Sequence, residues 1–214
     1  MRTDITTIDS KGNGVQLALN RTEGLADVHM LTKKDRLHLR LLAEEIFSMV
    51  TAIVGDFSAK YWAEGEEGEY RIILQADADI TEEEEEQLLS ISTSGENTAS
   101  RGIMARIWKH YKAALKENRK AAVMEAARGM TYGEAEILYG KLGTIRFDGE
   151  NGEEEYAWSL KQYKSNVQKL LKEDESAKGR WDELEKSIVA NIASDVRVGV
   201  TEDHVKMVIY MDLN

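Results

Sequence analysis

The chain of 214 residues contains no cysteine and no proline. The absence of cysteine excludes disulfides, thiolate metal ligands and a cysteine nucleophile. The absence of proline excludes cis-proline turns, proline-rich linkers and PxxP ligands. No run approaches the 18 apolar residues of a membrane-spanning helix, and the first residues lack the apolar stretch of a secretory signal. We therefore expect a soluble, cytoplasmic protein that has no membrane partner.

Negative charge predominates, because 39 acidic residues face 28 basic ones for a formal net charge of −11. Such a balance disfavours binding of nucleic acid by the surface as a whole. The hydrophobic share of 42% is ordinary for a globular chain. We expect a single domain over residues 1–214, with an insertion at about 93–180.

The order of extended and helical patterns predicts the fold class. Strands are expected at 3–8, 15–19, 60–64, 70–76, 144–147, 154–158, 195–200 and 205–211. Helices are expected at 22–30, 32–53, 81–91, about 99–128 with a break, a short stretch from 131, about 160–172 and about 181–193. This order predicts an α+β, two-layer sandwich with helices on one face of a mixed, mainly antiparallel sheet. A large helical insertion plus a hairpin interrupts it.

The clearest element is the helix that begins after Thr32. Asp35 follows at the spacing of a capping box, with Asp in place of Glu. Apolar residues then recur every three or four positions, at Leu39, Leu42, Ile46, Val50 and Ile53. This spacing puts them on one helical face, which we expect to pack on the sheet.

Common catalytic motifs are absent. The chain has no GxxxxGK[ST] phosphate loop, no GxSxG and no HExxH. The four histidines are far apart in sequence, and we expect no metal site from them. The acidic run 82–86 is interpreted as the solvated start of a helix.

Charge is segregated along the chain. Residues 64–86 carry a net charge of −10, and residues 101–128 carry eight basic and two acidic side chains. Trp108 and Tyr111 lie among those bases, an arrangement that also occurs at nucleic-acid sites. We favour an exposed helix face that pairs with the acidic segment, within or between chains, and expect nucleic-acid binding to be unlikely.

Three segments, at 41–50, at 70–79, and at 184–196 with the final strand 205–213, together resemble a known family. They are similar to the N-box helix (E-x-x-x-N), the strand ending in the D-x-G box, and the last helix and closing hairpin of the histidine-kinase-type ATPases. This superfamily is also called GHKL or the Bergerat fold, and the branch of anti-sigma-factor serine kinases is the most similar. The resemblance covers roughly residues 1–92 and 180–214. It implies ATP and magnesium as cofactors, and a sigma factor, its antagonist or a second copy as partner.

The resemblance assigns roles to four residues. Glu45 falls on the general base of the N-box, but Met49 replaces the asparagine that holds magnesium. A thioether is a poor ligand for this hard cation, which prefers oxygen. Asp77 falls on the aspartate that contacts adenine, but Asp79 replaces the glycine that lets the backbone approach the nucleotide. We therefore expect Glu45, Met49, Asp77 and Asp79 to mark a vestigial nucleotide site.

Other departures concern register and the phosphate loop. An alternative N-box register pairs Glu44 with Ser48. Glu183 and Glu185 fall where the family has its glycine-rich G-x-G, and carboxylates there would repel phosphate. Nearby glycines that could form a relocated loop are Gly179 and Gly102.

The resemblance leaves alternative functions open. The first is a degenerate ATPase-like scaffold that acts as a regulatory, protein-binding module with weak or lost nucleotide binding, and hence no enzyme. The second is an ATP-dependent serine/threonine-type anti-sigma-factor kinase with Glu45 as base and Asp77 at adenine. A third is a nucleic-acid-associated module that uses residues 101–128. We expect residues 93–180 to carry the partner surface, since the predicted sandwich is complete without them.

Overall fold

The computed structural model describes residues 1–54, 56–66, 68–77, 144–148, 154–171, 175–200 and 204–213. The helices predicted between 81 and about 140, the basic segment 101–128 and Asp79 lie outside these ranges. The described residues form an α+β fold, as the sequence predicts.

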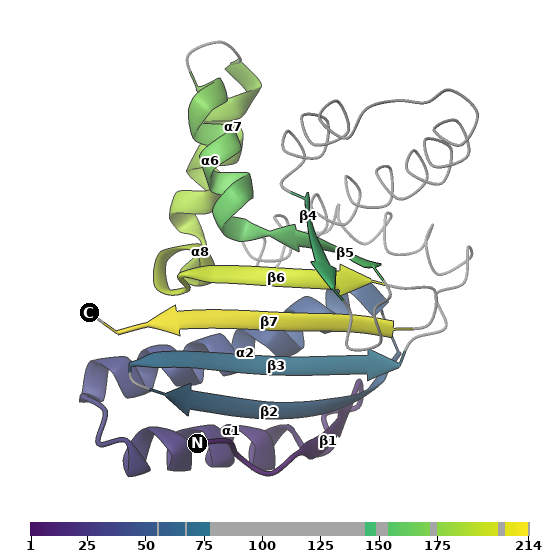
Figure 1. Cartoon of the computed structure of the whole chain (residues 1–214), viewed down its shortest axis with the longest axis vertical. Coiled ribbons are helices and arrows are strands. Elements are labelled where there is room, and N and C mark those ends of the chain that lie inside the picture. Colours follow the sequence, from purple (N-terminus) through teal and green to yellow (C-terminus); the bar gives the residue numbers. More distant parts are fainter. Residues whose placement is uncertain are drawn as a thin grey trace.

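In the described part of the chain, seven strands form one sheet in the order β1-β2-β3-β7-β6-β5-β4, and each neighbouring pair is antiparallel. The strands are β1 (Thr6–Asp9), β2 (Ser58–Glu66), β3 (Glu69–Asp77), β4 (Thr144–Asp148), β5 (Glu154–Ser159), β6 (Asp195–Val200) and β7 (His204–Asp212). The helices are α1 (Val15–Val28), α2 (Lys33–Val54), α6 (Leu160–Leu170), α7 (Glu175–Lys186) and α8 (Ile188–Ile192). Figure 1 shows β7, the last strand of the chain, between β3 and β6.

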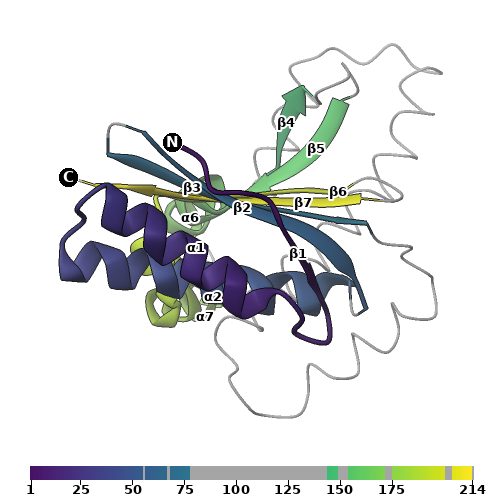
Figure 2. The same cartoon turned by 90° about the horizontal axis from the view of Figure 1, so that it is seen from below.

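The helices lie on one side of the sheet. Figure 2 shows α1, α2 and α7 beneath the strands, while the β4–β5 hairpin rises on the opposite side. Among the described helices, none covers that opposite face. No described helix combines the length and apolar character needed to cross a membrane. Within the described ranges, the helices therefore cover one face of the sheet.

The core lies between α2 and the central strands. Strand residues alternate in direction, so every second side chain of β2, β3 and β7 points to the helices. The largest of these fully buried side chains belong to Tyr61, Ile72, Leu74, Met207 and Ile209. From α2, the apolar stripe predicted from the sequence is buried against them, at Leu39, Leu42, Ile46 and Val50. The predicted packing of this helix on the sheet is confirmed.

One buried hydrogen bond fixes α1 to the sheet. The hydroxyls of Thr22 on α1 and Tyr61 on β2 lie 2.6 Å apart, and the Thr22 hydroxyl also donates to the Ala18 carbonyl. Burial raises the pKa of Tyr61 above its ordinary value, because water no longer stabilises the phenolate. Tyr61 therefore remains protonated and joins the two layers.

The prediction of a strand at 15–19 is wrong, because these residues begin α1. Only the first five residues alternate, whereas the buried positions over the full helix follow a helical spacing: Ala18, Leu19, Thr22, Leu25 and Ala26. The preceding turn is stabilised by Asp9, whose carboxylate accepts hydrogen bonds from Asn13 and from the amide of Lys11. The side-chain bond from Asn13 lowers the pKa of Asp9.

The expected sandwich is not complete without residues 93–180. The predicted hairpin exists as β4 and β5, but β5 also pairs with β6 and extends the main sheet. Leu160 and Val167 of α6 and Ala177 of α7 are buried in the same core as α2. The segment from 144 onward therefore belongs to the fold and is not an addition to it.

The helix predicted at 181–193 is two helices. Ser187 separates α7 from α8, and its hydroxyl accepts a hydrogen bond from the Ala190 amide as an N-cap. Lys164 of α6 donates to the Ala190 carbonyl, and burial lowers the pKa of this lysine. These contacts hold α6 against α8.

Replacing Ile46 with aspartate tests the packing of α2. Ile46 is 0% exposed, so Ile46→Asp would bury an unpaired carboxylate and should lower the free energy of unfolding by about 3–5 kcal/mol. Ser48→Asp, at an exposed position of the same helix, should change it by less than about 0.5 kcal/mol. Urea unfolding of both variants provides the measurement. Equal midpoints for the two variants would contradict the packing.

Two glycines of the N-terminal region should respond in opposite ways to alanine. Gly14 has φ 77°, and an added Cβ would lie 2.1 Å from the Thr7 carbonyl oxygen. Gly14→Ala should therefore destabilise the protein by more than about 2 kcal/mol. Gly24 is exposed within α1 and has open space around it, so Gly24→Ala should stabilise by about 0.5–1 kcal/mol. Thermal unfolding measures both effects, and a neutral Gly14→Ala would contradict the left-handed turn.

Candidate functional site

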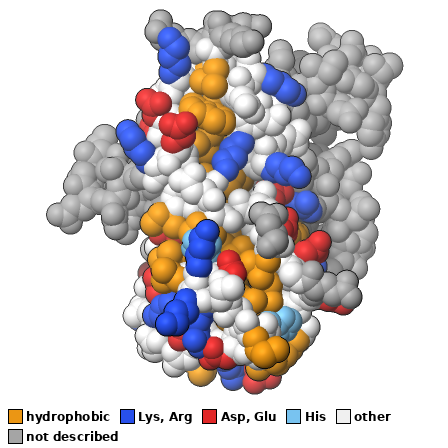
Figure 3. All heavy atoms as spheres, turned by 90° about the vertical axis from the view of Figure 1, so that its left-hand side faces the viewer, with side chains coloured by type: hydrophobic (Ala, Val, Ile, Leu, Met, Phe, Trp, Pro, Cys, Tyr) orange, Lys and Arg blue, Asp and Glu red, His pale blue; other side chains and the backbone are white. Residues whose placement is uncertain are grey.

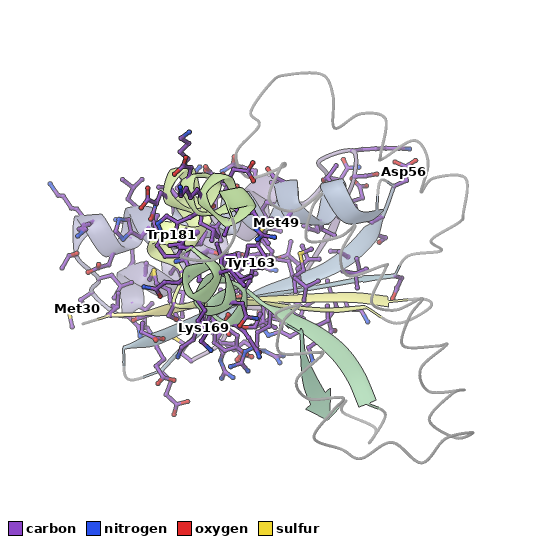
Figure 4. All side chains as sticks on the ribbon, turned by 90° about the horizontal axis from the view of Figure 1, so that it is seen from above. Met30, Met49, Asp56, Tyr163, Lys169 and Trp181 are labelled. Atoms are coloured by element: carbon purple, nitrogen blue, oxygen red, sulfur yellow. The ribbon has the colours of Figure 1, made fainter. Side chains whose placement is uncertain are left out.

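The two N-box positions lie one turn apart on α2, and both are shielded. Met49 is 3% exposed and belongs to the apolar core. Figure 4 shows it between Met30 at one end of the molecule and Asp56 at the other. Glu45 is partly buried, and its Oε2 has no hydrogen-bond partner within the described part of the chain. The helix therefore offers one carboxylate oxygen but no second oxygen ligand at position 49.

Asp77 lies at the end of β3 and is exposed. Its cross-strand neighbours are Ser58 on β2 and His204 on β7. Since β2 begins shortly after α2 ends at Val54, Asp77 is at the sheet end where α2 terminates. Glu45 lies nine residues before that terminus, which is about 14 Å along the helix axis. Glu45 therefore lies in the helix layer well before the end of α2, whereas Asp77 lies in the sheet near that end.

The expected phosphate-loop position is helical. Glu183 and Glu185 lie in the last turns of α7, and Glu185 accepts a hydrogen bond of 2.8 Å from the indole of Trp181. Gly179 also lies inside α7, whereas Gly102 is outside the described residues. None of the three described residues belongs to a loop whose amides could surround a phosphate.

The alternative N-box register of the resemblance uses Glu44 and Ser48, which lie at the surface side of α2. Ser48 is exposed. Glu44 binds Arg40 at 2.9 Å, and the same guanidinium binds Glu23 of α1 at 2.6 Å. This ion-pair group joins α1 to α2 at the surface, so Glu44 has a structural partner already.

The sheet also carries a surface that the sequence patterns did not predict. We call it the open face: the side chains of β2, β3, β7 and β6 that point away from the helices. Strand registry arranges them in four rows across the sheet: Lys60–Gln75–Lys206, Trp62–Ile73–Val208–Arg197, Glu64–Arg71–Tyr210–Asp195 and Glu66–Glu69–Asp212. Figure 1 looks onto this face, with α2 behind the strands.

The centre of the open face combines apolar and aromatic side chains. Ile73 and Val208 are 5% and 9% exposed, yet neither belongs to the core on the helix side. Trp62 and Tyr210 flank them and are half-buried. Arg2 lies 5.8 Å above the Trp62 ring, and Arg197 lies 4.7 Å above that of Tyr210. Such cation–aromatic pairs form a surface with both apolar and charged contacts.

Two arginines of the open face are already paired with acids. Arg71 binds Glu64 at 3.0 Å, and Glu64 also accepts from the Trp62 indole at 2.9 Å. Arg197 binds Asp195 at 3.0 Å. The central rows are therefore neutralised within the sheet.

Asp195 is the most connected of these acids. Its Oδ1 accepts from the Ser159 hydroxyl, the Lys161 amide and the Val196 amide at 2.8–3.1 Å. Ser159 in turn caps α6 by accepting from the Gln162 amide. The carboxylate thus anchors the start of α6 to the start of β6 and serves a structural role.

The sequence patterns predict the individual strands of the open face, the strand at 205–211 among them, but they do not predict which outward side chains these strands bring together. A signal was available, since Trp62 and Tyr210 are aromatic residues at outward positions of two strands. In the described ranges, no group of three or more His, Asp or Glu residues is placed to hold a metal ion.

Removing the Asp195 carboxylate should loosen α6 from the sheet. Asp195→Ala leaves the Ser159 hydroxyl and the Lys161 amide without their acceptor, so the free energy of unfolding should fall by about 1–3 kcal/mol. Asp4→Ala removes an 86%-exposed carboxylate and should change it by less than about 0.5 kcal/mol. Chemical unfolding followed by tryptophan fluorescence compares them. A loss of stability no larger than that of Asp4→Ala would contradict the anchoring role.

Comparisons of this chain with protein-family models, with curated proteins and with solved structures find no match. The resemblance to histidine-kinase-type ATPases therefore stays a prediction from three sequence segments. The α+β sandwich, the helical site positions and the open face are the observations on which a functional proposal can rest.

Proposed function

We propose that this protein is a regulatory, protein-binding module with an ATPase-like fold whose nucleotide site has been lost. The observation that carries the proposal is the position of Met49. At the place where the resemblance expects a magnesium ligand, a thioether is 3% exposed among apolar side chains. Without that ligand, the charge of a triphosphate lacks its usual neutraliser.

The geometry around α7 supports the same proposal. Phosphates bind where free backbone amides meet at the start of a helix. Glu183 and Glu185 lie at the opposite end, in the last turns of α7. Partial negative charge gathers at a helix C-terminus, so both the carboxylates and the helix would repel a phosphate.

A protein-binding role is supported by the open face. A sheet face that carries Trp62, Ile73, Val208 and Tyr210 together has the aromatic and apolar content of an interface centre. The charged rows on either side resemble the polar rim of such a surface. A sigma factor, its antagonist or a second copy of the chain remains the partner class that the resemblance implies.

One observation favours the kinase alternative. The Oε2 atom of Glu45 is buried and without a hydrogen-bond partner within the described residues. An unpartnered carboxylate oxygen is the group that this alternative requires as general base, provided that a substrate hydroxyl reaches it. In this alternative, ATP would be the phosphoryl donor and Asp77 would contact adenine.

Calorimetry with ATP and with ADP, each with and without magnesium, separates the two functions. We expect no binding in the micromolar range, and no dependence on magnesium, because the cation ligand is absent. Glu45→Gln is the matched variant, since it preserves the shape of the side chain and removes the base.

A low-micromolar affinity for ATP would overturn the proposed loss of the nucleotide site. Phosphate transfer to a serine-containing protein, abolished by Glu45→Gln, would establish the kinase instead. Asp56→Asn changes an exposed carboxylate near the end of α2 and controls for the change in charge.

A further inference from the structure

The turn that joins α1 to α2 presents a methionine to solvent. Met30 follows the end of α1, and it is 89% exposed. Its φ of 51° belongs to the left-handed region, which lets the Leu31 amide donate to the Ala26 carbonyl at 3.0 Å and close the helix end. Figure 4 shows Met30 at the edge of the molecule, on the opposite side from Asp56. Water and small solutes therefore reach the Met30 thioether in the folded state.

The other methionines of the described residues differ in their access to solvent. Met49, Met207 and Met211 are 3%, 0% and 3% exposed and belong to the core. A reagent in water reaches their sulfur atoms only when the protein opens locally or globally. Met1 is 63% exposed and is expected to react as well. The fold thus separates accessible thioethers from protected ones.

We infer that Met30 is a site of reversible oxidation by hydroperoxides. A lone pair of its sulfur attacks one oxygen of hydrogen peroxide, so that an S–O bond forms while the O–O bond breaks. The sulfur loses two electrons and becomes a sulfoxide, and the other oxygen leaves as water with both hydrogens of the peroxide. An organic hydroperoxide releases an alcohol in the same way. This inference does not depend on the proposed function, because it concerns another part of the molecule.

Oxidation of Met30 should leave the fold unchanged. The turn is held by the backbone hydrogen bonds that end α1 and by an ion pair between Arg36 and Asp27. The preceding residue, His29, shares a hydrogen bond of 3.0 Å with the Tyr70 hydroxyl. These interactions use the backbone of Met30 or other side chains, so the added oxygen displaces none of them. At a core position, by contrast, a polar sulfoxide would disrupt the packing.

The consequence is a local change of surface polarity. Val28 of α1 and Leu37 of α2 are 60% and 53% exposed. Oxidation converts Met30, the most exposed of the three apolar residues, into a polar sulfoxide. Methionine sulfoxide reductases restore the thioether, and an exposed turn gives them access to it. Met30 can therefore change between an apolar and a polar state while the chain stays folded.

Peptide mapping of the native protein after treatment with hydrogen peroxide tests the inference. Trypsin cleaves after lysine and arginine, so the peptide 22–33 contains Met30 as its one methionine, and the peptide 41–60 contains only Met49. Mass spectrometry follows the gain of one oxygen atom in each peptide with time. We expect peptide 22–33 to be oxidised at least about tenfold faster than peptide 41–60, because the core thioether reacts only after opening. In urea, where the protein is unfolded, the two rates should become equal.

A second set of measurements concerns the fold and the reversal. After a treatment that oxidises peptide 22–33 but not peptide 41–60, circular dichroism and melting temperature should equal those of the untreated protein. A methionine sulfoxide reductase should then remove the oxygen from peptide 22–33 without denaturant. Met30→Leu is the matched variant, because it keeps an apolar side chain and removes the sulfur. Peroxide should shorten the retention of wild type on a hydrophobic-interaction column more than that of Met30→Leu.

Equal oxidation rates of the two peptides in the native protein would overturn the inference. So would a Met30 thioether that reacts more than tenfold more slowly in the native protein than in urea, since it would then be shielded. A sulfoxide that the reductase leaves in place would overturn the reversibility, and a lowered melting temperature would contradict the unchanged fold. Nucleotide calorimetry is independent of these results: ATP binding would overturn the proposed function and leave the oxidation of Met30 intact.

Discussion

One-sided burial of a single antiparallel sheet is the constraint on which the other features depend. Alternate residues of β2, β3 and β7 point to the helices and form one apolar core with α2. The remaining residues are left on the opposite side, because a strand directs its neighbours to opposite faces. The same alternation thus defines both the core and the open face, and a shift of one residue in any of these strands would exchange them.

Much of the fold was predictable because several elements have strong local signals. The apolar stripe of α2, the strand β7 and the hairpin of β4 and β5 were predicted and are present. The start of α1 was predicted wrongly, because five alternating residues satisfied a strand pattern while the helical spacing appeared only over 14 residues. The break at Ser187 was missed because a single hydroxyl forms the cap. Strand order could not be predicted, since it depends on pairing between distant segments.

The candidate site was predictable only in part. Sequence spacing placed Glu45 and Met49 one turn apart on α2, and the structure confirms this while showing how deeply Met49 is buried. Burial of a single residue depends on what packs over it, which spacing does not describe. The open face needed strand registry, because Trp62 and Tyr210 are 148 positions apart in the sequence and come to the same face, on the two strands that flank β3, only in the folded sheet. Apolar residues such as Val28 and Met30 are exposed elsewhere on the surface, and Figure 3 shows hydrophobic side chains interspersed with charged ones on another side of the molecule.

The place of β7 in the sheet has a consequence for biosynthesis. This strand comprises residues 204–212, close to the end of the sequence, yet it lies in the middle of the sheet between β3 and β6. While the chain emerges from the ribosome, β3 keeps an unpaired edge until residues 204–212 arrive. Exposed strand edges and apolar surface promote aggregation of incomplete chains. The nascent protein therefore needs protection until residues 204–212 have been made, and a chain cut short before residue 204 would lack the strand that joins the two halves of its sheet.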